Sequence, residues 1–153
     1  MDARYRIRPA RSADAAPLAE IERRCFSDPW SEAGIEETIQ HGTTIGLIAE
    51  LAGKVTGYLM IRISGEEGEI LNLAVLPEHR RRGIARELLA RGIAALQSAG
   101  VAEAYLEVRE SNQAAISLYG ANGFKPVGMR PHYYRSPAED ALVLRVQLAP
   151  VRN

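Results

Sequence analysis

The chain has 153 residues, of which 46% are hydrophobic, enough for one domain with a full core. Its 19 Lys and Arg residues balance 19 Asp and Glu residues, so the net charge of zero gives no reason to expect nucleic acid or a membrane surface as a partner. A single cysteine, Cys25, excludes an intrachain disulfide framework and agrees with a reducing compartment. With no apolar run near the ~20 residues that span a bilayer and no signal-peptide stretch, we expect one cytoplasmic domain over residues 1–153.

The first third of the chain is predicted to alternate between strands and helices. Spacing of apolar residues and turn chemistry indicate five elements: a strand at Tyr5–Pro9, a helix from about Ser12 to Cys25, a helix to about Gln40 with Ser31 as its N-cap, and β-rich runs at Thr43–Leu51 and Val55–Ile63. The intervening Ala52-Gly53-Lys54 is typical of a hairpin turn, so the two β-rich runs should pair with each other.

The middle of the chain predicts a strand, a helical crossover and a second strand. After a turn at residues 64–68, Ile70–Leu76 is an apolar strand, and apolar residues from Ile84 to Leu96 recur at helical spacing before Gly100 ends the helix. The next strand, Ala104–Arg109, should pair parallel to the first through a right-handed connection.

The last third of the chain is predicted to contain a helix and two strands. The helix begins at Ser111-Asn112 and ends at Asn122-Gly123. The strands cover Phe124–Arg130 and Ala141–Leu148, and a loop over residues 131–137 joins them.

Residues 78–86, Glu-His-Arg-Arg-Arg-Gly-Ile-Ala-Arg, carry the clearest functional signal. They join a strand to a helix, so the free N–H groups and the dipole of the first helical turn point at this loop. Gly83 allows close approach of a ligand, and the arginines add positive charge, which together indicate a phosphate site. The alternative is a connecting loop with solvated arginines.

Three polar residues follow in the two elements after this helix. Glu107 interrupts an apolar strand near its carboxyl end, where ligands of open α/β sheets bind, although it could instead pair with Arg109 or another arginine. Asn112 and Tyr119 share one helical face, so the amide could hold a ligand near the phenol. The alternative is that Asn112 is only an N-cap and that Tyr119 belongs to the core.

The motifs as a set resemble one family. Arg80-x-x-Gly83-x-Ala85 is similar to the acetyl-coenzyme A loop of the GCN5-related N-acetyltransferases. The wider pattern resembles the RimI family of ribosomal-protein-alanine N-acetyltransferases; it comprises Phe26-x-x-Pro29-Trp30-Ser31, Asn72-Leu73-Ala74-Val75-x-Pro77, Leu106-Glu107-Val108-Arg109-x-x-Asn112, Ala115-Ile116-x-Leu118-Tyr119-x-x-x-Gly123-Phe124 and Arg130-x-x-Tyr133-Tyr134. Arg80 and Ala85 stand where many relatives have glutamine and glycine.

The resemblance implies a fold, a cosubstrate and a set of site residues. The implied fold is mixed α/β, a mostly antiparallel sheet of six to seven strands with a parallel pair at the cofactor site and about four flanking helices. The resemblance implies that acetyl-CoA is bound by the backbone of Leu73, Ala74 and Val75, by Asn112, and by the loop residues Arg81, Arg82, Gly83, Ile84, Ala85 and Arg86. It implies that Glu107 is the general base and Tyr119 the general acid. It also implies that Trp30, Tyr133 and Tyr134 form the walls of a peptide slot. A core role for Trp30 is the alternative.

The acceptor that this resemblance implies is the N-terminal amino group of a ribosomal protein, most specifically an N-terminal alanine. Two other classes stay open: an acetyltransferase for a small amine such as a polyamine or aminoglycoside, and a non-enzymatic acyl-CoA sensor, which would need neither Glu107 nor Tyr119. The spacing of His41, His79 and His132 indicates no metal site. We expect a monomer or weak dimer without direct nucleic-acid or membrane contact.

Overall fold

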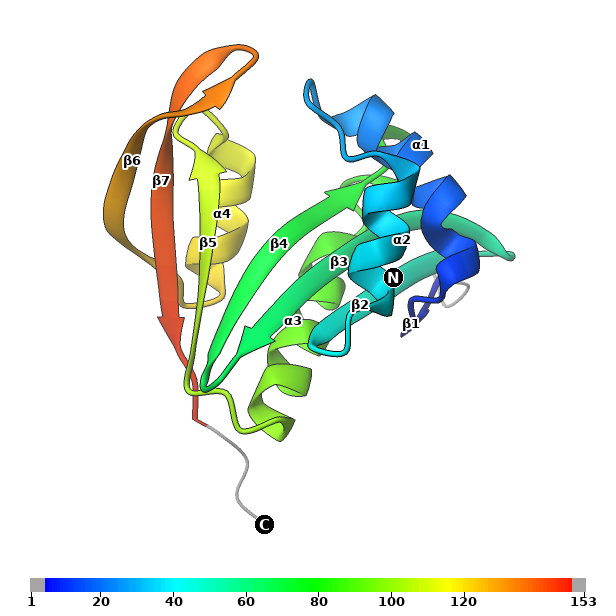
Figure 1. Cartoon of the computed structure of the whole chain (residues 1–153), viewed down its shortest axis with the longest axis horizontal. Coiled ribbons are helices and arrows are strands. Elements are labelled where there is room, and N and C mark those ends of the chain that lie inside the picture. Colours follow the sequence, from blue (N-terminus) through cyan, green and yellow to red (C-terminus); the bar gives the residue numbers. More distant parts are fainter. Residues whose placement is uncertain (1–4, 150–153) are drawn as a thin grey trace.

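A computed structural model describes residues 5–149 of the chain, and Figure 1 shows one sheet with helices packed on it. The strands are β1 (Tyr5–Pro9), β2 (Thr44–Leu51), β3 (Lys54–Ser64), β4 (Glu67–Val75), β5 (Glu103–Arg109), β6 (Lys125–Arg135) and β7 (Ala138–Gln147). The α-helices are α1 (Ala15–Cys25), α2 (Glu32–Gln40), α3 (Ile84–Ser98) and α4 (Gln113–Ala121), and short 3₁₀ turns cover Ser12–Asp14 and Pro77–His79. No helix in this part of the chain is long and apolar enough to cross a membrane.

The sheet confirms the predicted fold class. Its strand order is β1-β2-β3-β4-β5-β7-β6, and every neighbouring pair is antiparallel except β4 and β5, which run parallel. A parallel pair needs a crossover connection, and α3 supplies it. The predicted parallel pairing of these two strands is therefore confirmed.

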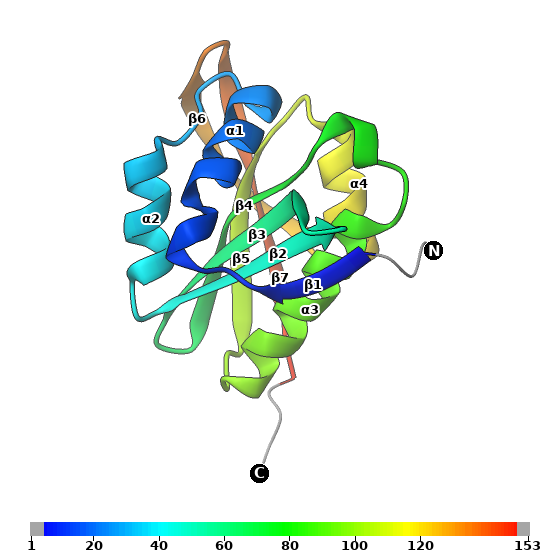
Figure 2. The ribbon, with the colours of Figure 1, turned by 90° about the vertical axis from the view of Figure 1, so that its right-hand side faces the viewer.

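Helices cover both faces of the sheet and divide the core in two. Figure 2 shows α1 and α2 on one face and α3 and α4 on the other. Between α1, α2 and the sheet lies a cluster that includes Leu18, Ile35, Ile48 and Met60, all at most 1% exposed. On the other face a larger cluster packs α3 and α4 against the sheet; its fully buried members include Leu59, Ile61, Leu88, Leu89 and Leu96. Both clusters follow from the period of two along the strands and of 3.6 along the helices.

The parallel pair separates soon after it begins. Pairing between β4 and β5 covers only the first three residues of each strand, from Glu67 with Glu103 to Glu69 with Tyr105. Beyond that point β5 continues along β7, whereas β4 stays with β3, and Figure 1 shows the two strands diverging toward their carboxyl ends. A gap therefore opens in the middle of the sheet, and the edge of each strand that faces it has no strand partner.

Two predicted turns are shorter in the structure, and one of these predictions was wrong over most of its length. Residues 131–137 were expected to be a loop, but β6 continues to Arg135 and pairs with β7 beyond an irregular stretch after Arg130. Ser136 and Pro137 do form a turn, but pairing between the strands overrode the turn preference of Pro131 and extended β6 up to Arg135. The turn expected at residues 64–68 is also confined, because β4 already begins at Glu67 opposite Ser64.

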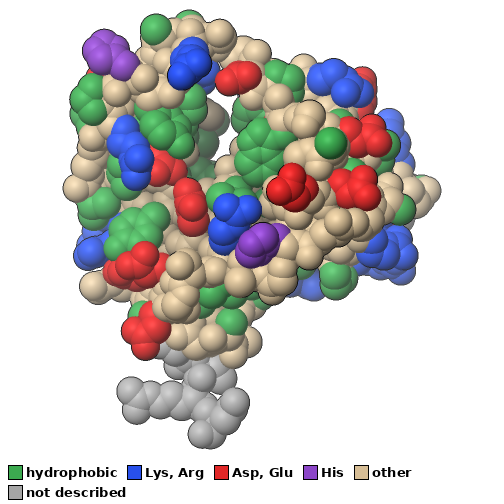
Figure 3. Space-filling model, viewed as in Figure 1, with side chains coloured by type: hydrophobic (Ala, Val, Ile, Leu, Met, Phe, Trp, Pro, Cys, Tyr) green, Lys and Arg blue, Asp and Glu red, His purple; other side chains and the backbone are tan. Residues whose placement is uncertain are grey.

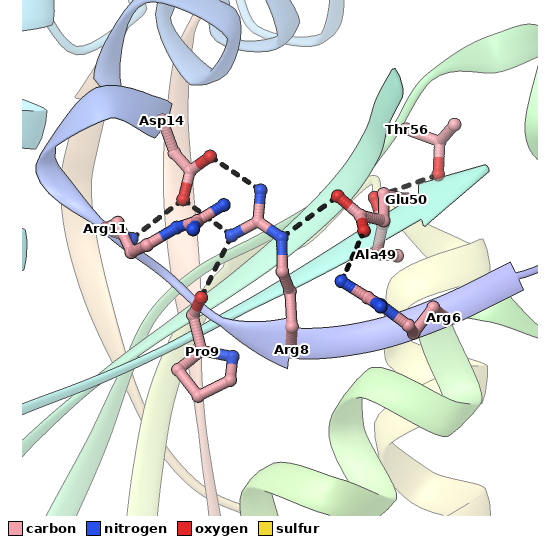
Figure 4. Close-up of polar contacts among 8 residues, drawn as sticks. All are labelled: Arg6, Arg8, Pro9, Arg11, Asp14, Ala49, Glu50 and Thr56. Carbon is pink, nitrogen blue, oxygen red and sulfur yellow. Dashed lines mark hydrogen bonds and ion pairs between the residues drawn. The ribbon is translucent and has the colours of Figure 1, made fainter. Parts of the chain in front are cut away.

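A buried ion pair joins β1 to the start of α1. Arg8 donates two hydrogen bonds to Asp14, at 2.9 and 2.8 Å, and a third to Glu50 on β2 at 2.9 Å (Figure 4). Asp14 also accepts from the backbone N–H of Arg11, and both side chains of the Arg8–Asp14 pair are less than 15% exposed. These contacts, with desolvation opposing them, lower the pKa of Asp14.

We expect Asp14→Ala to lower the free energy of unfolding by about 3 kcal/mol, because it leaves the charge of Arg8 buried without its main partner. Since the folded pKa of Asp14 lies below its unfolded value, this contribution is complete above about pH 4 and fades as the pH falls through the folded pKa. Urea unfolding at pH 7 measures the loss. The control is Glu20→Ala, which removes an exposed pair with Arg23 and should cost less than about 1 kcal/mol; equal losses for the two variants would contradict this account.

Candidate active site

The loop between β4 and α3 presents a row of free backbone N–H groups. Gly83 is the N-cap of α3 and has a φ of 80°, and Arg81 also has a positive φ, of 63°. The first backbone bond of the helix runs from the N–H of Glu87 to the carbonyl of Gly83, so the N–H groups of residues 84–86 have no helical acceptor. Together with the helix dipole, these groups favour an anion at this end of α3.

A pocket of about 380 Å³ lies at these free N–H groups. It is lined by Val75, His79, Arg80, Arg81, Gly83, Ile84, Ala85, Arg86 and Leu118. Five of the six predicted loop residues therefore meet in one pocket. The sixth, Arg82, lines a neighbouring hollow along α3 and donates to the hydroxyl of Tyr5 at 3.0 Å. Arg80 lines the pocket while its Nε donates to the carbonyl of Val75 at 2.9 Å.

The edge of β4 that faces the gap offers alternate backbone groups. The N–H of Leu76 donates to the carbonyl of Thr56, which directs residue 76 toward β3. Backbone groups alternate in direction along a strand, so those of Val75 and Leu73 face the gap and those of Ala74 face β3. A ligand in the gap can therefore reach backbone groups of Leu73 and Val75, as predicted. The backbone of Ala74 bonds to β3 instead, and its small side chain is buried in the cluster between α1, α2 and the sheet.

The helix α4 combines a cap with a core residue. Asn112 is its N-cap, and its Oδ1 accepts from the N–H of Ala115 at 3.1 Å, so the capping interpretation is confirmed. Its Nδ2 has no acceptor within residues 5–149 and could still bind a ligand. Tyr119 is 7% exposed and stacks edge-on against Phe124, which confirms that its ring belongs to the core. Burial and the nearby phenol of Tyr134 raise the pKa of Tyr119, so its hydroxyl keeps its proton at neutral pH.

Glu107 lies on the opposite face of the sheet from this helix. Along β5 the residues Ala104, Leu106 and Val108 are buried, whereas Glu107 points to the other, α1 side and is half-buried. The gap has opened by this position, two residues beyond the last residue that pairs with β4. Burial is the main cause that raises the pKa of Glu107, and the charge of Glu69 adds to it.

Arg130 opposes this effect from the edge of the sheet. Its Nε lies 3.4 Å from Oε1 of Glu107, and its charge lowers the pKa of that carboxyl. The sequence leaves open a pairing of Glu107 with Arg109 or a neighbouring arginine. Arg109 pairs instead with Glu139 at 3.3 Å, and the arginine beside Glu107 is exposed Arg130. Glu107 therefore has a solvent-facing partner and is not locked in a buried ion pair.

Two loops stand on either side of the carboxylate face. The α1–α2 loop, residues 26–31, carries Trp30, and the β6–β7 loop meets it where the hydroxyl of Ser27 donates to the carbonyl of Ser136. Tyr133 is 46% exposed and Tyr134 is half-buried, with their rings edge-to-face at 5.0 Å. Figure 3 shows the molecule hollowed between these two sides, with acidic side chains on the wall of the hollow. We call this hollow the acceptor groove.

The gap thus has two different sides. On the α3 and α4 side lie the anion pocket and Tyr119, and on the α1 and α2 side lie Glu107 and the acceptor groove. An anionic ligand on one side can present a reactive group through the gap to a second ligand on the other. A carboxylate on the second side and a protonated phenol on the first are suited to take up and to donate a proton, respectively. Within the described residues, no group of three or more His, Cys, Asp or Glu side chains is arranged to hold a metal ion.

Several residues near the site were not found from the sequence. Tyr5 and His79 are joined by a 2.8 Å hydrogen bond from β1 to the 3₁₀ turn before the loop, and this contact between distant segments left no local signal. Glu22 on α1 is 1% exposed. Its signal was present, because Glu22 follows Leu18 by four residues and so places a charge within the apolar stripe of the helix.

Comparison with known proteins agrees with this geometry. The sequence profile of the acetyltransferase (GNAT) family matches residues 15–124. The [ribosomal protein bS18]-alanine N-acetyltransferase of Escherichia coli K12 is 32% identical over 90% of this chain and 94% of its own length, and the N-alpha-acetyltransferase RimI of Mycobacterium tuberculosis is 38% identical over 87% and 86%. The crystal structure of the ribosomal-protein-S18-alanine N-acetyltransferase from Escherichia coli superposes with a TM-score of 0.89 over 97% of both chains, at 30% identity.

The profile covers more than half of the chain, and these relatives cover most of it at 30% identity or above. Their agreement extends over both sides of the gap, from α1 to the helix after β5. The chain therefore belongs to the acetyltransferase (GNAT) family and, within it, to the RimI group.

Proposed function

We propose that the chain transfers the acetyl group of acetyl-CoA to the N-terminal α-amino group of a protein. The observation that carries the proposal is the position of Glu107, a half-buried carboxylate at the gap, on the face of β5 opposite the side chains that pack against α3 and α4, with exposed Arg130 beside it. The Escherichia coli relative is named for the N-terminal alanine of ribosomal protein bS18. That name supports an alanine N-terminus of a small-subunit ribosomal protein as acceptor, and hence action in the cytoplasm.

The anion pocket fits the pyrophosphate of acetyl-CoA. Its lining combines the free N–H groups at the start of α3 with the guanidinium groups of Arg81 and Arg86. The edge of β4 leaves the backbone groups of Leu73 and the N–H of Val75 without a strand partner, so they can pair with the amides of a pantetheine arm as an added strand would; the carbonyl of Val75 already accepts from Nε of Arg80. A solved GNAT-fold neighbour from Thermoplasma acidophilum, 20% identical, is described as a complex with coenzyme A. When bound there, acetyl-CoA supplies an activated acetyl group.

Glu107 is suited to remove a proton from an α-amino group. A protonated amine has no lone pair with which to attack a carbonyl, so it must first lose a proton. At pH 7 this costs about 1 kcal/mol for an α-amino group of pKa about 8 and nearly 5 kcal/mol for lysine of pKa about 10.4. Because the pKa of Glu107 is raised, it lies closer to the pKa of the α-amino group than that of an ordinary glutamate. Proton transfer from the amine to Glu107, directly or through water, is therefore less unfavourable.

Tyr119 is suited to stabilise the thiol side of the reaction. Its raised pKa means that full proton transfer to a thiolate, whose conjugate acid has a pKa of about 8.5, is uphill by more than about 2 kcal/mol. The phenol therefore acts best as a hydrogen-bond donor that stabilises the developing thiolate and keeps its own proton. Because backbone groups alternate along β4 and that of Leu76 points to β3, the N–H of Val75 faces the gap, and we assign it as a donor to the carbonyl oxygen that gains charge.

Trp30, Tyr133 and Tyr134 are proposed as the walls that hold the peptide. Tyr133 and Tyr134 lie near the end of β6, and Tyr133 in particular exposes its ring. Trp30 lies on the α1–α2 loop and is half-buried, packed against the cluster between α1, α2 and the sheet. Arginine side chains support both tyrosines: Arg130 lies over the ring of Tyr133 at 5.8 Å and Arg109 over Tyr134 at 4.3 Å. Open aromatic walls suit an extended chain better than a compact small amine.

A panel of peptides tests the proposal. Each peptide carries a different first residue with a free N-terminus, a second panel has the N-terminus blocked and an internal lysine, and spermidine represents the small amines. Thiol release from acetyl-CoA is measured for all of them. We expect turnover with free N-terminal alanine and almost none with the blocked panel. Faster turnover of spermidine than of any peptide would assign the chain to the small-amine class.

We expect Arg130→Gln to move the acidic break in the profile of log kcat/KM against pH to a higher pH. Below the pKa of both Glu107 and the substrate amine, log kcat/KM rises with a slope of two, and the slope falls to one above the pKa of Glu107. Removing the nearby positive charge raises that pKa further, so the break moves to higher pH. The control is Arg145→Gln, whose partner Glu103 lies 3.8 Å away where the gap is still closed. A break that stays in place in Arg130→Gln would show that another group sets it.

A further inference from the structure

Glu22 is a buried carboxylate that the proposed reaction does not use. It lies on the face of α1 that packs on the sheet and is 1% exposed. Three donors converge on it: the backbone N–H of Trp30 reaches Oε1 at 2.9 Å, the amide of Asn72 reaches Oε2 at 2.6 Å, and the hydroxyl of Tyr58 also donates to Oε2. No ion pair within residues 5–149 includes this carboxylate.

The three donors come from separate parts of the fold. Tyr58 and Asn72 belong to β3 and β4, the fixed centre of the sheet, whereas Trp30 belongs to the α1–α2 loop. One oxygen of Glu22 is therefore held by the sheet and the other holds the loop. An apolar residue here would avoid the cost of desolvating a charge but could not hold the loop N–H.

The loop that Glu22 holds forms one side of the acceptor groove. It begins beside the gap, because Sγ of Cys25 lies 3.7 Å from the carbonyl of Val75 at the end of β4. It reaches the opposite side of the groove through the contact of Ser27 with Ser136. Between Ser27 and the start of α2, the loop is held to the rest of the protein by the hydrogen bond from the backbone N–H of Trp30 to Glu22. Moving that anchor would displace the indole of Trp30.

We propose that Glu22 is a positioning residue, which sets the place of Trp30 in the acceptor groove through the reach of its side chain and not through its charge. This inference rests on the proposed function, because it assigns Trp30 to the acceptor. The carboxylate acts as a fixed bridge of definite length between β4 and the loop. Burial raises the pKa of Glu22, and the N–H of Trp30 and the hydroxyl of Tyr58 oppose this effect, so the group is held by its donors and not by a counter-charge.

Two substitutions separate reach from charge. Glu22→Gln keeps the length and an acceptor oxygen for the N–H of Trp30. The new amide nitrogen takes the place of Oε2, so the amide of Asn72 must turn to accept from one of its N–H groups, and the hydroxyl oxygen of Tyr58 can accept from the other. Glu22→Asp keeps the charge but is shorter by one methylene, so it cannot hold both the sheet and the loop. We expect KM for the alanine peptide to rise at least tenfold in Glu22→Asp and to stay within threefold in Glu22→Gln. The value of kcat and the dissociation constant of acetyl-CoA should stay within twofold in both.

Emission of Trp30, the only tryptophan of the chain, gives a second readout that needs no turnover. A red shift is expected in Glu22→Asp and not in Glu22→Gln. The control is Thr56→Val on β3. It removes a buried hydrogen bond of 3.2 Å from Oγ1 of Thr56 to the carbonyl of Ala49, which lies away from the groove. It should change melting temperature without changing emission or KM.

The outcomes distinguish the inference from the proposed function. Loss of peptide affinity in Glu22→Gln but not in Glu22→Asp would show that charge matters and would overturn the inference. Equal losses in KM, kcat and acetyl-CoA binding would show a general structural role and would overturn it too. A wild-type chain that acetylates no peptide would refute the proposed function, and the emission of Glu22→Asp would then decide alone whether Glu22 holds the loop.

Discussion

Glu107→Gln is expected to lower turnover by about 10² to 10⁴ while leaving acetyl-CoA affinity almost unchanged. The amide is nearly the same size as the carboxylate but cannot accept a proton at neutral pH, so the amine must lose its proton to solvent. The anion pocket, where we propose that acetyl-CoA binds, lies on the other side of the sheet and should not sense the change. Steady-state kinetics with an alanine peptide and calorimetric titration with acetyl-CoA measure the two effects separately.

Glu103→Gln is the matched control for this loss. Glu103 lies on the same face of β5 but where β5 still pairs with β4, and it accepts from the hydroxyl of Tyr105 at 2.8 Å. Its substitution should leave turnover within twofold. Full activity of Glu107→Gln between pH 6 and 9 would mean that another residue or bulk water removes the proton.

Gly83→Val is expected to weaken acetyl-CoA binding by tenfold or more. The residue caps α3 with a φ of 80°, a conformation that β-branched side chains rarely adopt, and its added atoms would stand where the pyrophosphate approaches the free N–H groups. A methyl group at this position would not be crowded by the protein itself, since its nearest neighbour would be Nη2 of Arg86 at 3.6 Å. The steric conflict is therefore with the ligand. Calorimetric titration of the folded variant measures the loss.

Gly100→Val separates this conflict from backbone strain. Gly100 has nearly the same φ, 81°, lies beyond the other end of α3 and has open space around it. Its substitution should lower stability by about as much as Gly83→Val without changing acetyl-CoA affinity. A normal dissociation constant in folded Gly83→Val would show that the arginine loop is only a connection between β4 and α3.

Most helices and strands could be predicted from the sequence because caps, turns and apolar periodicity depend on residues that are only a few positions apart. Ser31 caps α2 by accepting from the N–H of Gly34 at 3.0 Å, and Gly100 takes the left-handed conformation expected at the end of α3. The prediction of a loop at residues 131–137 was wrong because the pairing of β6 with β7 lies outside such a short range. Ser136 and Pro137 form the turn that their residue types favour, but pairing of Tyr134 with Glu139 on β7 makes a strand of the residues before it. That pairing joins two segments and is not visible in a local window of the sequence.

The site followed the same division. The strand-to-helix junction at Gly83 and the half-buried Glu107 could be predicted as candidates because each breaks a local pattern, by a glycine with neighbouring arginines and by a charge in an apolar strand. The direction of Arg82 toward Tyr5 and the bridge from Glu22 to Trp30 depend on contacts between distant segments. No periodicity predicts such contacts, and they required the fold.

One peptide that carries both a free N-terminal alanine and an internal lysine tests the central claim most directly. After incubation with acetyl-CoA and the wild-type chain, fragmentation mass spectrometry locates the added acetyl group on one nitrogen or the other. The cost of deprotonation, about 1 kcal/mol against nearly 5 at pH 7, predicts acetylation of the α-amino group with the lysine left free. Acetyl groups on the lysine at an equal or greater rate would contradict the assignment of this chain as an N-terminal acetyltransferase.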